Sequence, residues 1–424
     1  MAFLSSIQRT TRQRENSTLL FIGLSTIFLL NPFLSVILCA ASILVSKPRG
    51  NTMLYFWFAI TALWLGLLNI TKEPESDQLM YLIYFNRAAD LNPLDGILHY
   101  AGRSEKEPIY GLLNYLCYWL LNGNARLFFI ACSFIEYYIL FISIYTILSH
   151  SGYGLKSVVF GVIISAFFTQ FFVLSIHLLR QVMAFSIVFY AISRKAVDGK
   201  NHWLPLICAP LIHSTAALFS ILSLLPWIFH RMNLRQWIYF ILILMSLISS
   251  CIAIGSTLTN LLGEDNGSSY IFRRMSDGYD DGGTMDIVKS LIIIIPLWTI
   301  CVIALTKRLS GSKCQNVSHT NGYYSPLYPI IHLFIFLSVM VLSFSSLPLI
   351  QYRFAFVNYS FLGFLLPILF NRKNKIQNLY ILTTSIFFII YFLSTYQLSG
   401  WTYRIDVAQI LLYPAPLYFI LSPL

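Results

Sequence analysis

The chain has 424 residues, of which 57% are hydrophobic, 16% aromatic and only 11% charged. This composition excludes a single soluble domain, and apolar runs of about 20 residues are typical of helices that cross a membrane. The formal net charge of +11 does not require a nucleic-acid partner, because basic residues also gather at the cytosolic ends of membrane helices. We therefore expect an all-α polytopic membrane protein that binds no nucleic acid.

Apolar runs follow one another along most of the chain, and we expect them to form about 10–12 transmembrane helices in one membrane-embedded domain, 1–424. The polar segment 1–17 is expected to stay in the cytosol, and a short apolar piece lies at 109–121. The longer runs are 19–45, 52–70, 126–148, 155–175, 178–193, 203–229, 236–259, 287–306, 327–346, 352–370, 377–396 and 407–423.

The charges predict the orientation of these runs. Basic clusters without matching acids recur between the runs, and placing all of them in the cytosol puts two loops, 71–125 and 260–286, outside. These two loops hold 13 of the 17 acidic residues. This segregation of charge supports a multi-pass protein whose acidic loops face the outside of the cell.

Two runs do not fit an alternation of cytosolic and external loops, because 19–45 and 203–229 each begin and end at a basic cluster. A run of about 27 residues is too short for two full crossings. We expect each to be a pair of short half-helices, with Asn31-Pro32 and His213-Ser214 near the tips. A single tilted span with one cluster on the wrong side is the alternative.

The first external loop contributes candidate carboxylates and aromatic side chains. Asp77, Tyr81 and Tyr84 share one helical face by their spacing. Glu107 precedes Pro108 and a short apolar segment. It is interpreted either as a helix-capping acid or as a carboxylate presented at the mouth of a cavity.

Further candidates lie in or beside apolar runs, where charged side chains are costly. Arg180 and Gln181 stand about one turn inside such a run, and His213 interrupts another. By the predicted topology Arg180, Arg353 and Arg404 come to the same external depth. Arginines from three separate segments at one interface favour a diphosphate or polyanion site over three independent snorkelling side chains. The Asp77, Glu107 and His213 side chains are candidate general bases, and we leave the choice between Glu107 and His213 open.

In order along the chain, these residues resemble the EpsG-like and Wzy-type polysaccharide polymerases of bacterial envelopes. The residues that carry the resemblance are Asp77 with Tyr81 and Tyr84, Glu107-Pro108, Leu179-Arg180-Gln181 before Met183-Ala184, Ile212-His213-Ser214, and Arg353. The resemblance covers about residues 50–370, and its most specific part is Arg-Gln followed by the histidine about thirty residues later.

The resemblance implies a metal-independent membrane glycosyltransferase without a cofactor. Such an enzyme polymerises undecaprenyl-diphosphate-linked oligosaccharide units into O-antigen or a related surface polysaccharide at the periplasmic face of the bacterial inner membrane. The charge that develops on a leaving diphosphate needs fixed cations, and the predicted topology puts Arg180, Arg353 and Arg404, with Gln181, where they would bind it. Tyr81 and Tyr84 would stack on the sugar rings. A chain-length regulator and a flippase are partners that the resemblance suggests.

Two other functions fit parts of the pattern. A ligase would transfer finished glycan from the same lipid carrier to lipid A-core, and its loss would leave long chains unattached rather than short. A lipid-linked oligosaccharide flippase would need a polar path to the cytosolic side. The clustering of buried charges toward the external half disfavours the flippase.

Overall fold

The computed structural model describes residues 18–46, 51–99, 107–232, 235–243, 245–246, 283–306, 325–343, 348–370, 375–396 and 403–412. The named elements within these ranges are all helices, and an isolated antiparallel bridge joins Lys72 to Tyr403. Most of the predicted loop 260–286 lies outside the described residues, as do large parts of the predicted runs 236–259 and 407–423.

The helices follow the apolar runs of the sequence, and the first of them is Thr18–Leu30. The labelled helices are α2 (Pro32–Ser46), α3 (Thr52–Asn69), α4 (Ser76–Asn86), η1 (Arg87–Asp90), α5 (Pro93–Leu98), α6 (Pro108–Leu120), α7 (Ala125–His150), α8 (Leu155–Phe167), α9 (Thr169–His177), α10 (Leu179–Asp198), α11 (Trp203–Ile212), α12 (Ala216–Leu224), η3 (Pro226–Phe229), α15 (Gly283–Thr306), α16 (Tyr328–Ser343), α17 (Pro348–Ser360), α18 (Leu362–Leu365), η4 (Leu366–Phe370), α19 (Lys375–Thr395) and α20 (Val407–Leu412).

In the described part of the chain, four helical segments are long and apolar enough to cross a membrane: α3, α7, Arg353–Phe370 and Asn378–Thr395. The bent pair α8 and α9 makes a fifth if it counts as one span, and five further apolar helices have 10–17 residues. Within the described ranges, fewer helices of spanning length are therefore present than the ten to twelve expected of the whole chain. Several predicted runs form shorter helices, and α10 carries charged residues at both ends. The all-α, polytopic class is confirmed.

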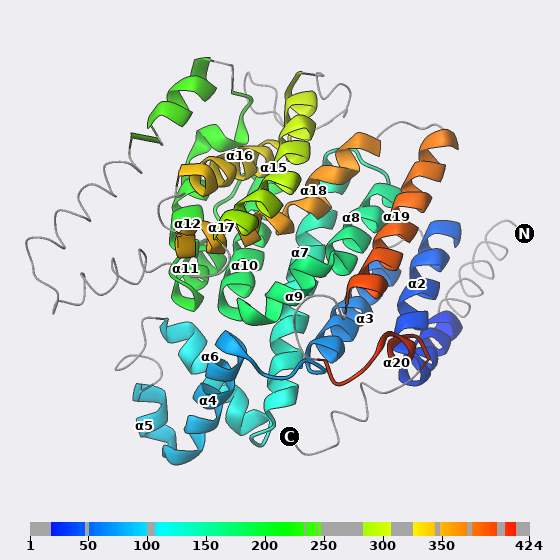
Figure 1. Cartoon of the computed structure of the whole chain (residues 1–424), viewed down its shortest axis with the longest axis vertical. Coiled ribbons are helices and arrows are strands. Elements are labelled where there is room, and N and C mark those ends of the chain that lie inside the picture. Colours follow the sequence, from blue (N-terminus) through cyan, green and yellow to red (C-terminus); the bar gives the residue numbers. More distant parts are fainter. Residues whose placement is uncertain are drawn as a thin grey trace, which may run out of the picture.

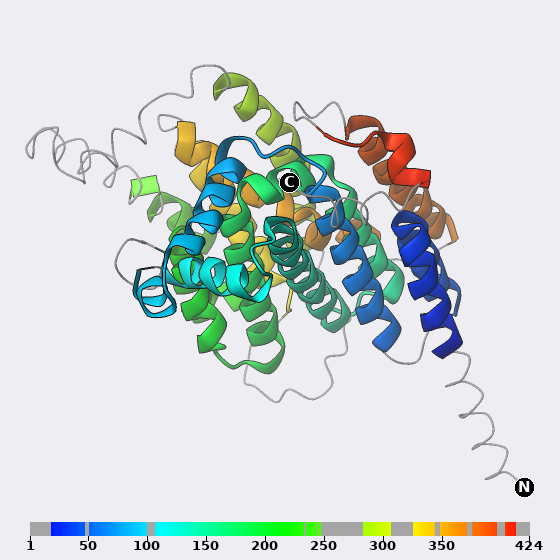
Figure 2. The same cartoon turned by 90° about the horizontal axis from the view of Figure 1, so that it is seen from below.

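Helix α7 lies at the centre of the bundle, where it packs along both α3 and α10 and also contacts α8. The short helices α4, α5 and α6 of the predicted first external loop gather at one end of this bundle (Figures 1 and 2). There α4 contacts α6, α7 and α9, and α6 contacts α11. This end of the bundle therefore brings together segments that lie far apart in the sequence.

The predicted run 19–45 is broken at Asn31, as expected. The Ser35 hydroxyl donates to the carbonyl of Leu24 at 2.8 Å. In a straight helix these residues would be separated by about 16 Å along the axis. The chain therefore folds back on itself near Asn31, whose side chain accepts from the backbone N–H of Leu34 at 2.9 Å.

The predicted run 203–229 is broken at His213, also as expected. His213 has extended backbone angles, φ −152° and ψ 124°, between α11 and α12, and these two short helices contact each other. The predicted arrangement of two half-helices is consistent with this break, while the side of the membrane on which they enter stays a prediction.

The predicted run 155–175 forms two helices joined by a bend rather than one straight helix. Helices α8 and α9 meet at an angle of 59°, because Phe168 takes extended backbone angles between them. Neither proline nor glycine marks this position. At the bend, the hydroxyl of Thr169 hydrogen-bonds that of Thr395 at 2.6 Å, so the break is accompanied by a polar contact with α19.

Candidate functional site

Glu107 stands immediately before α6 and directs its carboxylate away from that helix. Pro108 occupies the first helical position, where its missing N–H costs nothing, and the Glu107 side chain makes no capping hydrogen bond to α6. Its Oε2 instead accepts a hydrogen bond from Nη1 of Arg180 at 2.7 Å. Of the two predicted roles, the capping acid is excluded, and the carboxylate pairs with an arginine on another helix.

Arg180 is the second residue of α10, which starts after a break at Leu178. A cation in the first helical turn is unfavourable for the helix dipole, so α10 itself does not explain the arginine. The guanidinium lies 5.2 Å from the ring centroid of Tyr81 and 5.5 Å from that of Tyr110. Two aromatic rings and one carboxylate therefore hold Arg180, and its side chain is 32% exposed.

Tyr81 joins this cluster from α4, and its hydroxyl donates to the carbonyl of His177 at 3.3 Å. Burial raises the pKa of Tyr81 to about 12, although the positive charge of Arg180 acts in the opposite direction. The phenol therefore stays protonated over the physiological range, and Tyr81 acts as a neutral ring and hydrogen-bond donor.

His213 reaches the same carboxylate from the break between α11 and α12. Its Nε2 lies 3.8 Å from Oε1 of Glu107, and that oxygen also accepts the backbone N–H of Ser214 at 3.1 Å. On its other side, Nδ1 accepts the backbone N–H of Thr215 at 3.3 Å and lies 2.7 Å from the hydroxyl of the same residue. Because Nδ1 accepts, we assign the proton of the neutral ring to Nε2, which faces Glu107.

Arg353 is attached to the cluster through Gln181. The side-chain amide of Gln181 donates to the backbone carbonyl of Arg353 at 2.8 Å, which ties α17 to the start of α10. The charge of Arg353 also acts on Tyr81 and on His213. Two guanidinium groups, one carboxylate and one imidazole thus gather at one end of the bundle, contributed by α10, α17, the start of α6 and the tip between α11 and α12.

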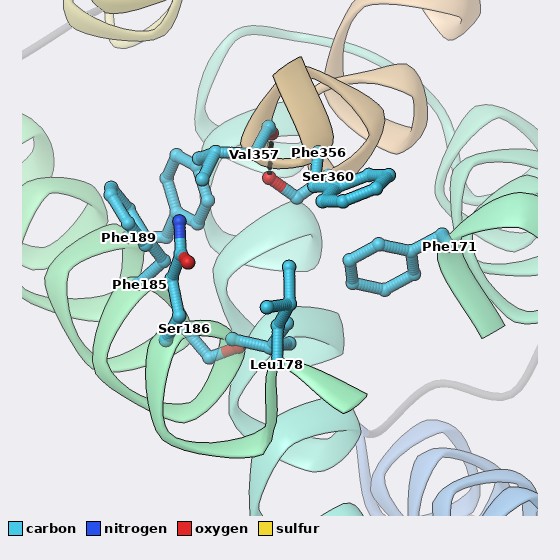
Figure 3. Close-up of a pocket in the computed structure, with 10 residues that line it drawn as sticks. Phe171, Leu178, Phe185, Ser186, Phe189, Phe356, Val357 and Ser360 are labelled. Atoms are coloured by element: carbon cyan, nitrogen blue, oxygen red, sulfur yellow. Dashed lines mark hydrogen bonds between the residues drawn. The ribbon is translucent and has the colours of Figure 1, made fainter. Parts of the chain in front are cut away.

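An apolar pocket lies beside Gln181, between α9, α10 and α17 (Figure 3). Its free space is only about 10 Å³. Phe171, Leu178, Phe185 and Phe356 point toward one another around it. The polar cluster therefore borders a narrow apolar crevice.

Asp77 lies at the edge of this cluster, and two other predicted site residues lie apart from it. Asp77 is half-buried at the start of α4, where its charge acts on Tyr81 one helical turn further on. Tyr84 packs with Ala88 and Tyr115 in a separate small cluster. Arg404 lines a different pocket and lies 3.7 Å from Glu73, so the three arginines predicted to share one site are divided between two places.

The arrangement suits charge stabilisation and proton transfer. Arginines bind phosphate oxygens through their planar fork, and the carboxylate can accept a proton once its arginine has another anion to bind. In the part of the chain that the structure describes, no group of three or more histidine, cysteine, aspartate or glutamate residues could hold a metal ion.

Two buried cations were not among the predicted site residues. Lys72 and Arg126 are only 2% and 4% exposed, yet in the sequence each stands at the edge of an apolar run. A charge at such a position is typical of the end of a span, so its burial shows only in the folded chain.

A model of the EpsG family matches residues 53–405, which include every residue of the cluster. No curated protein and no solved structure matches the chain. The match extends over most of the sequence and includes the residues on which the resemblance was based. The chain therefore belongs to the EpsG family, and its role is of the polysaccharide-polymerase type.

Proposed function

We propose that this chain joins undecaprenyl-diphosphate-linked oligosaccharide units into O-antigen or a related surface polysaccharide, at the periplasmic face of the bacterial inner membrane. The observation that carries the proposal is the Glu107–Arg180 ion pair, 2.7 Å long, with His213 beside it. It unites a base and a phosphate-binding group at the end of a bundle of apolar helices.

Arg180 and Arg353 bind the diphosphate of the donor, which is the growing chain on its lipid carrier. When the bond between the anomeric carbon and the phosphate oxygen breaks, the electron pair leaves with the diphosphate and its negative charge increases. Fixed guanidinium groups stabilise this charge better than water does, because they need no reorganisation. The first backbone N–H groups of α10 add to the attraction, since the N-terminus of a helix favours anions.

Glu107 accepts the proton of the attacking hydroxyl on the incoming unit. In the empty site its carboxylate is engaged by Arg180, and the diphosphate competes for the same guanidinium. Binding of the donor therefore releases Glu107 at the moment when a base is needed. His213 positions the carboxylate through its Nε2, while its Nδ1 is occupied by Thr215 and is not available to take the proton.

The apolar side chains beside Gln181 contact the first part of the lipid chain (Figure 3). A polyprenyl chain leaves its diphosphate as hydrocarbon, so it needs an apolar surface directly next to the phosphate-binding arginines. The phenylalanine rings of α9, α10 and α17 provide that surface. Aromatic and apolar side chains with few polar groups are typical of such ligand sites.

Reconstitution tests the proposal. The purified full chain in vesicles, given a defined undecaprenyl-diphosphate-linked oligosaccharide, should produce dimers and longer products, and Arg180→Ala should be inserted normally but inactive. In cells, the same variant should leave glycans of a single unit. Wild-type chain lengths in that variant would refute the proposal, and long but unattached chains would identify the ligase instead.

A further inference from the structure

A cluster of buried polar side chains lies where the end of α3 meets α7 and α9. None of its members belongs to the proposed active site, and each is no more than 2% exposed: Asn69, Lys72, Ser133, Glu136, Tyr137 and Ser175. Polar and charged groups are costly inside a bundle of apolar helices. What these side chains contact indicates what the cluster does.

Lys72 directs its ammonium at α9. Its Nζ donates to the carbonyls of Val173 at 3.0 Å and Phe172 at 3.3 Å, and lies 4.4 Å from the centroid of the Phe172 ring. The carboxylate of Glu136, on α7, lies within electrostatic reach of this ammonium, and in the described part of the chain neither of its oxygens has a hydrogen-bond partner. Glu136 therefore acts as the counter-charge of Lys72 and offsets the cost of burying it.

Ser175 fastens α9 to two further helices through its hydroxyl. This hydroxyl accepts a hydrogen bond from the amide of Asn69 at 3.3 Å and one from the hydroxyl of Tyr137, on α7, at 3.2 Å. Helix α9 has nine residues and is bent by 59° from α8. A helix this short gains little stability from its own backbone hydrogen bonds, so side-chain contacts of this kind decide where it lies.

The position of α9 determines that of Arg180. Only Leu178 separates α9 from α10, in which Arg180 is the second residue. At the end of α9 the carbonyl of His177 accepts the hydroxyl of Tyr81, whose ring centroid lies 5.2 Å from the Arg180 guanidinium. A displacement of α9 would therefore move both Arg180 and the ring beside it. Misplacement of a reacting group by about 1 Å can lower a rate by about 10²-fold.

We propose that Lys72 is a positioning residue of the active site, which holds α9 so that Arg180 meets the diphosphate of the donor, and that Glu136 keeps the ammonium of Lys72 in place. This inference rests on the proposed function, because the diphosphate is the ligand assigned there to Arg180. The ammonium of Lys72 is engaged by carbonyls of α9 and does not touch the reacting groups. Its effect on the reaction passes through Arg180.

A double-mutant cycle separates positioning from simple stabilisation. The probe is undecaprenyl diphosphate, titrated into the full chain in nanodiscs. Lys72→Met should weaken its binding about tenfold, a usual coupling between residues of one contact network. In an Arg180→Gln background the same substitution should have no further effect, because the displaced guanidinium is already absent. Lys72→Arg keeps a cation with several N–H donors and should retain most of the affinity.

Lys195 provides a matched control at the other end of α10. Its Nζ also donates to two backbone carbonyls, those of Ser223 at 2.6 Å and Leu224 at 3.3 Å, and lies 4.7 Å from the centroid of the Phe229 ring. Lys195→Met should lower the melting temperature and leave the diphosphate affinity unchanged.

Two further measurements keep the test independent of folding and of turnover. Removal of one partner of a buried ion pair is strongly destabilising, whereas replacement of both is often tolerated. Where Lys72→Met does not insert, the double variant Lys72→Met/Glu136→Leu therefore takes its place in the cycle. Backbone hydrogen exchange at the junction of α9 and α10 should become faster in the Lys72 variants and stay unchanged in Lys195→Met.

The outcomes separate this role from the proposed function. Unchanged diphosphate affinity in an inserted Lys72 variant would overturn the positioning role and leave the polymerase standing. An equal loss of affinity with and without Arg180 would also overturn it, because Lys72 would then act independently of Arg180. If Arg180→Gln by itself leaves the affinity unchanged, the donor site is refuted and the positioning role with it. If the binding results hold but the wild type forms no polymer, the polymerase is refuted while Lys72 still positions a diphosphate-binding arginine.

Discussion

Glu107→Gln should separate binding from catalysis, because it removes a charge and keeps the shape. The amide oxygen of the new side chain can still accept the backbone N–H of Ser214, but it cannot take a proton from a hydroxyl. We expect kcat to fall by about 10²–10⁴-fold, the usual contribution of a general base. The affinity for the diphosphate should rise, because the diphosphate no longer has to displace a carboxylate from Arg180.

The magnitude of this gain in diphosphate affinity follows from the exposure of the ion pair. A charge-assisted hydrogen bond is worth about 1.5–3 kcal/mol when well shielded, and exposed ion pairs contribute up to about 1 kcal/mol. The side chain of Arg180 is 32% exposed, so we take about 0.5–1.5 kcal/mol, a two- to tenfold tighter dissociation constant. The measurement is a titration with undecaprenyl diphosphate in nanodiscs, alongside single-turnover kinetics.

Asp90→Asn is the matched control, since Asp90 is an exposed carboxylate of η1 in the same segment. It should leave both affinity and turnover unchanged. A Glu107→Gln variant that binds diphosphate more weakly than the wild type would show that the carboxylate does not compete for Arg180. A variant that retains full turnover would show that Glu107 is not the base.

Three further predictions concern the site and the packing around it. His213→Gln should lower kcat by about tenfold, less than Glu107→Gln, because His213 orients the carboxylate by one polar contact; an equal or larger loss would make His213 the base. Tyr81→Phe keeps the ring under Arg180 and should leave the pH–activity profile unchanged up to about pH 9. The reason is that burial raises the Tyr81 pKa to about 12, so no ionised phenol exists well below that value. A shift of the alkaline limb of the profile would contradict this. Gly363→Ala should lower the melting temperature strongly, because backbone and a side chain of α8 already occupy the place of the new Cβ, whereas Gly154→Ala meets open space and should not; thermal unfolding in detergent compares the two variants.

The sequence was sufficient to predict the elements that depend on local chemistry. Apolar runs marked the helices, and the pairs Asn31-Pro32 and His213-Ser214 marked two of the breaks, because proline and small polar residues interrupt an apolar helix. The grouping of Glu107, Arg180 and His213 was reached through their residue types and order along the chain. These three residues do lie together, with Arg180 and His213 on either side of the carboxylate.

Features that depend on tertiary packing could not be read in this way. The bend at Phe168 has no proline or glycine, and its polar contact is with Thr395, more than 200 residues further on. Arg404 was assigned to the depth of Arg180 by counting spans, yet depth does not specify position around the bundle. A backbone pairing with Thr71 places it in a different pocket, and no periodicity in the sequence encodes such a pairing.

Much of the proposed site lies where helices are interrupted, and the reason is energetic. A broken helix leaves backbone groups without partners, which is tolerated at membrane depth only where protein or water supplies them. Here the site supplies one of them, because Glu107 accepts the N–H of Ser214 beside the break at His213. The Glu107 side chain therefore both stabilises this break and presents a reactive group. Truncation of Glu107 to alanine would remove both roles at once, so only isosteric replacements can distinguish a catalytic loss from a loss of the fold.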